Sequence, residues 1–289
     1  MKTSIVENRG IRLFSESFGS PRDPAVLLIM GATASGAWWP DGFCADLAAR
    51  GRFVIRYDHR DTGGSTHYGP GKARYTVEDL ADDAIRILDG YGVKAAHVAG
   101  MSLGGYIAQL LCLKHSDRVL TITTMASERL AAADPTMPEI SPAVLDYHSR
   151  AADLDWDDRE AVVEYQVGAW ELMSGPAHEF DPDLIRTMAT AELARTPDPR
   201  AAFNHAGLGD ATGWIDRLQE IRQPALVIHG TDDIVLPYAH AEALQEALPN
   251  ARLVRLQGIG HELPRAAWPV VIEQIVRHTA GHRERPRAA

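Results

Sequence analysis

Residues 97–106 read HVAGMSLGGY and contain the pattern Gly-x-Ser-x-Gly, with Ser102 at its centre. The apolar residues before the pattern predict a buried strand, and apolar residues recur at helical spacing over 103–111. A serine at the apex of a strand–turn–helix junction holds its hydroxyl above the sheet, at a helix N-terminus whose dipole favours negative charge. Side chains larger than those of Gly100 and Gly104 would collide with neighbouring elements in so sharp a turn. Ser102 is therefore the candidate nucleophile.

On both sides of this junction, short apolar strands alternate with amphipathic helices. Strands are predicted at 5–7, 11–14, 25–30, 52–57, 95–99, 119–125, 225–229 and 251–256, the first two as a hairpin. Helices are predicted at 38–50, after the start signal formed by Thr76 and Asp79, from 103, at 240–248 and at 270–279. Such alternation predicts an α/β fold, with a mostly parallel central sheet flanked by helices.

Residues 128–213 break this alternation. They contain no convincing buried strand, and helices are predicted at 142–152, 159–172 and 182–193. We therefore expect a helical cap, or lid, inserted after the sixth strand and lying over one edge of the sheet. The two flanking segments, 1–127 and 214–289, are expected to form the core.

Composition excludes several classes of protein. The 289 residues have ordinary globular usage and a net charge of −10, the wrong sign for a generic binder of nucleic acid or anionic membranes. The N-terminus lacks the apolar stretch of a secretory signal, and the longest apolar run, 25–30, is too short to span a membrane. The expected location is the cytoplasm. Cys44 and Cys112 are too few for a disulfide scaffold, and the oligomeric state stays open.

A serine hydroxyl needs a base to take its proton, and the chain has 12 histidines. His261 lies in a Gly-rich loop just past the last predicted strand, so its side chain can reach the carboxyl edge of the sheet. It is the predicted base. His97 and His229 lie in or at the end of strands and are expected to be structural. His59 lies in a loop on the same edge as Ser102, where it could line a pocket or support the loop.

The base in turn needs a carboxylate that orients it. The strand predicted at 225–229 runs into Asp232 and Asp233, and either side chain could point inward. Asp233 is favoured, while Asp232 and Glu128 remain alternatives.

An oxyanion formed at the reacting carbonyl also needs hydrogen-bond donors. One is expected from the backbone N–H of Leu103, the residue after the nucleophile. The other is expected from the loop after the strand at 25–30, and the N–H of Ala32 is chosen.

With these residues in place, the chain resembles the α/β-hydrolases over about residues 10–127 and 214–280. Within that superfamily it resembles bacterial esterases of the aclacinomycin methylesterase type, in which the order along the chain is Ser, Asp, His. Ala32 replaces a glycine of that type, and the middle segment is less similar. The closer match rests on LIMG at 28–31, RYDHRDTG at 56–63, GMSLG at 100–104 and GIGH at 258–261.

The resemblance implies a serine carboxylic-ester hydrolase that forms an acyl-enzyme and needs no metal and no organic cofactor. Its partner would be a small-molecule ester, of which a methyl ester is one case. The aromatic residues of the middle segment are expected to cover an apolar cavity, which favours an ester that is medium to large and apolar. Candidate pocket residues are Met30, His59, Met101 and Trp170.

Other uses of the same residues stay open: hydrolysis of a lactone, hydrolysis of a C–C bond, or peracid formation. A more distant alternative is a relative that binds a ligand without turning it over. Dehalogenases and epoxide hydrolases of this superfamily are disfavoured, because they carry Asp where this chain has Ser102.

Overall fold

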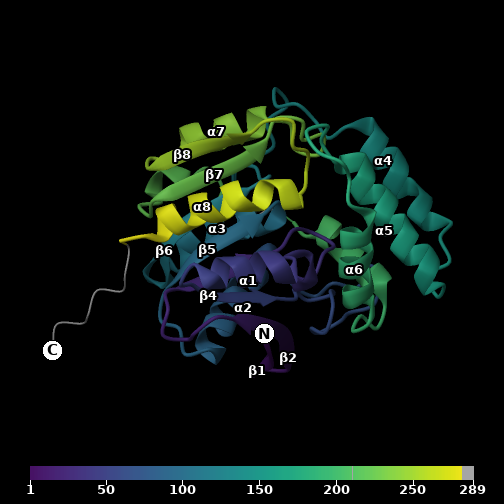
Figure 1. Cartoon of the computed structure of the whole chain (residues 1–289), viewed down its shortest axis with the longest axis horizontal. Helices are drawn as coiled ribbons and strands as arrows, with labels where there is room; N and C mark the ends of the chain where they lie inside the picture. Colours follow the sequence, from purple (N-terminus) through teal and green to yellow (C-terminus); the bar gives the residue numbers. More distant parts are fainter. Residues whose placement is uncertain (210, 282–289) are drawn as a thin grey trace.

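An eight-stranded sheet runs through the molecule in the order β1-β2-β4-β3-β5-β6-β7-β8 (Figure 1). The computed structural model describes residues 1–209 and 211–281, so 282–289, part of the predicted core, lie outside the described residues. Neighbouring strands from β4 across to β8 are parallel, whereas β2 pairs antiparallel with both β1 and β4. The predicted mostly parallel sheet is confirmed. The strands are β1 (Lys2–Asn8), β2 (Ile11–Phe18), β3 (Ala25–Ile29), β4 (Phe53–Tyr57), β5 (Ala96–Met101), β6 (Val119–Met125), β7 (Ala225–Gly230) and β8 (Ala251–Leu256).

Helices cover both faces of the sheet. One face packs against α1 (Asp41–Ala49) and α8 (Trp268–Thr279), and the other against α2 (Val77–Gly90), α3 (Leu103–Lys114) and α7 (Ala239–Ala247) (Figure 1). Successive residues of β3 alternate between the two apolar clusters, with Leu27 in one and Leu28 in the other. The central strands are thus buried on both sides, which explains their continuous apolar sequence.

Two of the predicted helices begin two or more residues away from their predicted start. The helix predicted from 38 begins at Asp41, because Pro40 keeps the preceding Trp39 extended, with φ −87° and ψ 100°. The residues before it form a 3-10 turn instead, η1 (Gly36–Trp38). The last helix begins at Trp268, earlier than predicted, since a proline is tolerated in the first turn of a helix.

The segment between β6 and β7 is helical, as the sequence predicts. It contains α4 (Pro142–Ser149), α5 (Arg159–Met173), α6 (Pro182–Leu193) and a 3-10 helix, η4 (Pro199–Gly207), that the periodicity did not predict. Figure 1 shows α4, α5 and α6 together at the right, beyond one end of the sheet. Among the described residues, no helix combines the length and apolar character needed to cross a membrane.

The order of the strands creates a crevice at their carboxyl ends. β3 lies between β4 and β5, so the chain leaves β3 toward one side of the sheet and later returns on the other side. Loops that follow β3 and β5 therefore diverge, and α/β folds bind ligands at such a point. The loop after β3 and the turn after β5 are the ones predicted to hold Ala32 and Ser102.

Candidate active site

Ser102 lies between β5 and α3 in a strained backbone conformation, with φ +52° and ψ −120°. Non-glycine residues rarely adopt positive φ, and such strain persists only where the surroundings hold it. Here the Ser102 N–H donates to the carbonyl of Met125 at 2.9 Å. Its own carbonyl accepts from Gly105 N–H and from the Ser127 hydroxyl, both at 2.8 Å. The turn is therefore fixed by hydrogen bonds to the end of β6, to Ser127 just beyond it and to the first turn of the helix.

The flanking glycines are required by close packing. A Cβ on Gly100 would overlap the carbonyl of Gly104, and a Cβ on Gly104 would overlap the carbonyl of Ile29 at the end of β3. The turn after β5 is thus pressed against α3 and against β3. Any larger residue at either position would push the Ser102 turn off the sheet.

His261 and Asp233 come together at the ends of β8 and β7. His261 Nδ1 lies 2.8 Å from Asp233 Oδ2, and both side chains are buried. The other carboxylate oxygen accepts the N–H groups of Val235 and Leu236, each at 2.8 Å. Burial alone would raise the pKa of Asp233, but His261 and His229 hold that pKa well below its usual range. Asp233 is therefore ionised at neutral pH and accepts the Nδ1 proton of His261.

The other two carboxylates considered from the sequence lie elsewhere. Asp232 is exposed, and Glu128 is about half exposed with its Oε2 3.6 Å from His240 Nδ1. Of the three, Asp233 is the one in contact with His261.

The loop after β3 runs beside Ser102. A Cβ on Gly31 would lie 3.2 Å from Ser102 Cβ, which brings this backbone into contact with the serine. Ala32, the next residue, is exposed. Leu103 is the first residue of α3, so its N–H has no acceptor within the helix. Both N–H groups chosen from the sequence thus lie on segments that meet at Ser102.

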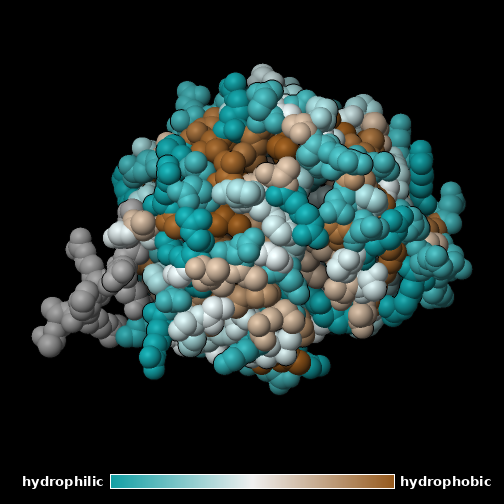
Figure 2. Space-filling view, in the orientation of Figure 1, coloured by the Kyte–Doolittle hydropathy of each residue, from teal (hydrophilic) through white to brown (hydrophobic). Residues whose placement is uncertain are grey.

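A cavity of about 290 Å³ adjoins these residues. Met101 and Glu262, the chain neighbours of Ser102 and His261, both line it. Residues just before α8 form part of its rim, and Figure 2 shows a hollow near that end of α8, where the core meets the helical segment.

Three of the four candidate pocket residues line this cavity: Met30, Met101 and Trp170. Trp170, from α5, stacks on Trp38 with ring centroids 4.8 Å apart and an interplanar angle of 17°. The two rings give the cavity a broad, flat apolar wall. His59 is not among the lining residues; it is fully buried below the loop after β3, where it bonds to the backbone of Met30.

The helical segment also contacts the loop that holds His261. The N–H of His261 donates to the carbonyl of Met173 at 2.9 Å. Glu262 Oε1 accepts from Gly175 N–H and lies within bonding distance of His178 Nε2, each at 2.7 Å. Burial opposes a charge on His178, but Glu262 raises its pKa above the ordinary value. The end of α5 and the loop after β8 are thus joined by backbone and side-chain bonds.

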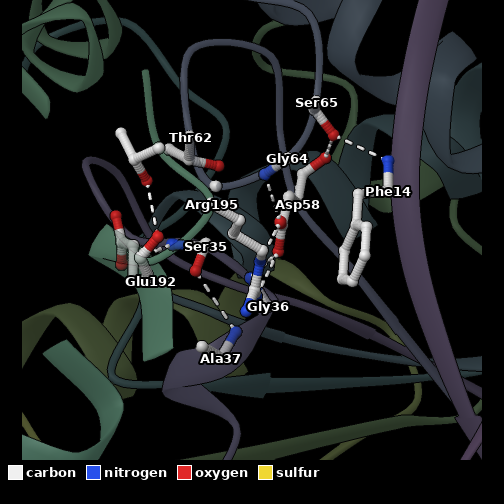
Figure 3. Close-up of polar contacts among 12 residues, drawn as sticks. Phe14, Ser35, Gly36, Ala37, Asp58, Thr62, Gly64, Ser65, Glu192 and Arg195 are labelled. Atoms are coloured by element: carbon white, nitrogen blue, oxygen red, sulfur yellow. Dashed lines mark hydrogen bonds and ion pairs between the residues drawn. The ribbon is translucent and has the colours of Figure 1, made fainter. Parts of the chain in front are cut away.

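On the opposite side of the crevice, Arg195 at the end of α6 forms a fork with Asp58. Its Nε and Nη2 lie 2.8 and 3.0 Å from the two carboxylate oxygens. The same oxygens accept the backbone N–H groups of Gly36 and Gly64, at 2.8 Å each. Figure 3 shows the Asp58 carboxylate between Arg195 and these two backbone segments. The pair ties the helical segment to the loop after β4 and, through the Gly36 N–H, to the loop after β3.

Glu192, one turn earlier on α6, reaches the same loop. Its Oε2 accepts the N–H of Ser35 at 3.3 Å and the indole N–H of Trp38 (Figure 3 shows the former contact). Burial raises the pKa of Glu192 from 4.5 to about 7, against the opposing effect of these hydrogen bonds. A group that is neutral below pH 7 thus contacts the tryptophan that forms the cavity wall.

Sequence reasoning missed these contacts between the helical segment and the core. The contact of Glu192 could have been predicted, because Glu192 falls at helical spacing on the apolar face of α6, where a buried carboxylate needs a hydrogen-bond partner. The contacts of Arg195, His178 and His205 could not have been predicted, because their partners lie far away along the chain.

Comparisons with known proteins identify the family of this chain. A family model described as the alpha/beta hydrolase fold matches residues 24–264. The chain is 35% identical to rhodomycin D methylesterase from Streptomyces peucetius, over 96% of this chain and 98% of that protein. It is 30% identical to pimeloyl-[acyl-carrier protein] methyl ester esterase from Aeromonas hydrophila, over 92% of this chain and 98% of that protein.

Among solved structures, an esterase from Exiguobacterium antarcticum superposes with a TM-score of 0.78 at 20% identity, covering 96% of this chain and 99% of that one. This likeness concerns the fold alone. Together the matches confirm the predicted fold class and the resemblance to the methylesterases.

The buried carboxyl of Glu192 makes stability depend on pH. Because its pKa is raised in the folded chain, the native state binds this proton more tightly than the unfolded state, and stability falls as pH rises from about 4.5 through 7. Glu192→Gln should remove this decline, which we expect to be about 1–3 kcal/mol between pH 5 and 8. Urea unfolding at both pH values measures it.

Glu164→Gln is the matched control, because Glu164 is an exposed carboxylate of the same helical segment whose pKa Arg186 lowers. It should keep the wild-type slope. An unchanged slope in Glu192→Gln would contradict the assignment of a neutral, buried Glu192.

Proposed function

Because the chain belongs to the α/β-hydrolase family and is a carboxylic ester hydrolase, we propose that it cleaves a methyl ester of a medium-to-large apolar acid through Ser102, His261 and Asp233. The observation on which this rests most heavily is the 2.8 Å bond between His261 Nδ1 and Asp233 Oδ2, beside the strained turn of Ser102.

The bond between Asp233 and His261 defines the tautomer of the base. An ionised carboxylate only accepts, so the imidazole proton lies on Nδ1 and leaves Nε2 free to take a proton. His261 then removes the proton of Ser102 as its oxygen attacks the ester carbonyl. The N–H groups of Ala32 and Leu103 hold the oxyanion of the tetrahedral intermediate.

The second half of the reaction uses the same residues. His261 gives its proton to the departing alkoxide, methanol leaves, and the acyl group stays on Ser102. A water molecule, deprotonated by His261, then attacks the acyl-enzyme and releases the acid.

The cavity supports a substrate with a large apolar acid part. Its wall includes the stacked rings of Trp38 and Trp170, which suit a flat apolar acyl group. The two relatives compared above are both named for the cleavage of methyl esters. The Glu262–His178 pair at the same cavity offers a polar contact to one edge of the acid.

The helical segment 128–213 is proposed to act as the lid of this cavity, over a core formed by the flanking parts of the chain. It supplies Trp170 to the cavity wall. It contacts the loops after β3, β4 and β8 through Glu192, Arg195 and Gly175 respectively. A lid bound this closely would exclude water from the acyl-enzyme except for the attacking molecule.

The substrate proposal is tested with methyl 2-naphthoate, butyl 2-naphthoate and methyl acetate. We expect kcat/KM to be about 10-fold or more higher for the methyl than for the butyl naphthoate, since a small alcohol site rejects added methylenes. Trp170→Ala should raise KM for methyl 2-naphthoate and leave methyl acetate unchanged. Ser102→Ala should abolish turnover of all three.

Trp156→Ala is the control, because Trp156 belongs to the same helical segment but does not line the cavity. Its KM values should match the wild type. Turnover of γ-lactones without turnover of any ester would contradict the proposal and favour the lactonase alternative.

The choice of carboxylate has its own test. Asp233→Asn should lower kcat by about 10⁴-fold, because the amide cannot hold the base in the correct tautomer. Asp232→Asn, a change of the adjacent and exposed carboxylate, should stay within about threefold of wild type, as surface changes usually do. Steady-state measurement of kcat for both variants shows which carboxylate orients His261. Equal losses, or the larger loss at Asp232, would contradict the assignment.

A further inference from the structure

The short segment 30–33, which contains Ala32, includes a second strained residue. Thr33 has φ +63°, a region that a β-branched side chain rarely enters. The Thr33 hydroxyl donates to the carbonyl of Ala32 at 2.6 Å. Since Gly31 lies against Ser102, the direction of the Ala32 N–H depends on what holds this segment at its two ends.

A histidine from the helical segment holds one end. The Thr33 N–H donates to His205 Nδ1 at 3.0 Å, and His205 Nε2 donates to the carbonyl of Arg60 at 2.8 Å. His205 is 5% exposed, and burial, aided by the neighbouring His59, lowers its pKa to about 4. The imidazole is therefore neutral, with its proton on Nε2, and its Nδ1 is free to accept from Thr33.

A histidine from the core holds the other end. His59 Nε2 donates to the carbonyl of Met30 at 2.9 Å. Its Nδ1 is buried and has no hydrogen-bond partner within the described residues, and burial lowers its pKa. The rings of His59 and His205 meet edge to face, with centroids 5.7 Å apart and an interplanar angle of 90°. One imidazole fixes the carbonyl before Gly31 and the other fixes the N–H after Ala32.

We infer that His59 and His205 are positioning residues of the oxyanion hole, which hold the segment Met30–Thr33 so that the Ala32 N–H points toward the carbonyl attacked by Ser102. The inference rests on the proposed function, because it assigns a role within that reaction. An oxyanion bond strengthens only as charge develops, so a misdirected donor lowers kcat and leaves substrate binding intact. His205 comes from η4, so the lid takes part in the chemistry as well as in covering the cavity.

Substitutions by asparagine and by glutamine distinguish the roles of the two imidazole nitrogens. The asparagine amide can occupy the position of Nδ1, and the glutamine amide that of Nε2. His205→Asn therefore keeps the acceptor for Thr33, and His205→Gln loses it. At His59 the order is reversed, since His59→Gln keeps the donor to Met30 and His59→Asn loses it.

Methyl 2-naphthoate turnover and inhibition by a naphthyl boronic acid, which forms a tetrahedral adduct on the serine, are measured for the four variants. We expect His205→Gln and His59→Asn to lower kcat by about 10–100-fold, short of the 10²–10³ for removal of a donor, with KM within about twofold. Boronate affinity should fall by a similar factor. His205→Asn and His59→Gln should stay within about threefold of wild type, because the critical bond is kept.

His240→Asn is the matched control. His240 is also buried, and its Nε2 bonds to the carbonyl of Pro138, away from the loop after β3. This variant should keep the wild-type kcat although it loses a buried imidazole bond. Thermal unfolding is recorded for every variant. If the variants at one position do not fold, the comparison of kcat between the Asn and Gln variants at the other position tests the inference.

The inference would be overturned if the Asn and Gln variants had the same order of kcat at both positions. Wild-type kcat in His205→Gln and His59→Asn would also overturn it, and so would an effect on KM without an effect on kcat. A wild-type protein that cleaves no ester would instead refute the proposed function itself. The two failures are therefore distinguishable.

Discussion

The turn at Ser102 is the constraint on which the site depends. Its positive φ puts the hydroxyl at the N-terminus of α3, and the strain is sustained because Gly100 and Gly104 let the turn pack directly on α3 and on the end of β3. Since β3 and β5 are parallel neighbours, the same packing brings the loop after β3 against the serine. The proposed nucleophile and one proposed oxyanion donor thus share a single structural cause, which is the alignment of two strands at the point where the chain reverses its direction across the sheet.

The helical segment is bound to loops on both sides of the candidate site. On one side, Gly175 and its neighbours meet the loop after β8 through backbone contacts so close that a Cβ on Gly260 would overlap the carbonyl of Met173. On the other side, Glu192 and Arg195 reach the loop after β3 and its support, Asp58. These bonds join elements that the sequence places far apart. They imply that displacement of this segment, the proposed lid, would disturb the geometry of the loops that hold the proposed catalytic residues as well as uncover the cavity.

Much of the fold could be predicted from periodicity, because strands buried on both faces are continuously apolar and helices repeat every three to four residues. The strand 119–125 and the helix 182–193 have the predicted bounds. The Gly-x-Ser-x-Gly motif predicted the tight turn between a strand and a helix that the structure has at Ser102. Less could be predicted where structure depends on distant contacts. No element was predicted over 199–207, so nothing in the sequence pointed to His205, and His59 could be placed only at the correct edge of the sheet. Asp232 and Asp233 are adjacent in sequence, so the sequence could not decide between them. In the structure, Asp233 is buried and Asp232 is exposed.

The central claim is that Ser102 is an activated nucleophile, and mass spectrometry after reaction with a fluorophosphonate tests it most directly. This reagent forms a stable bond to an activated serine and does not depend on the shape of the natural ester. We predict one adduct per chain, mapped to the peptide that contains Ser102, and no adduct in Ser102→Ala. Labelling at another residue, or none in the folded wild-type protein, would contradict the proposed role of Ser102 and of the base that serves it.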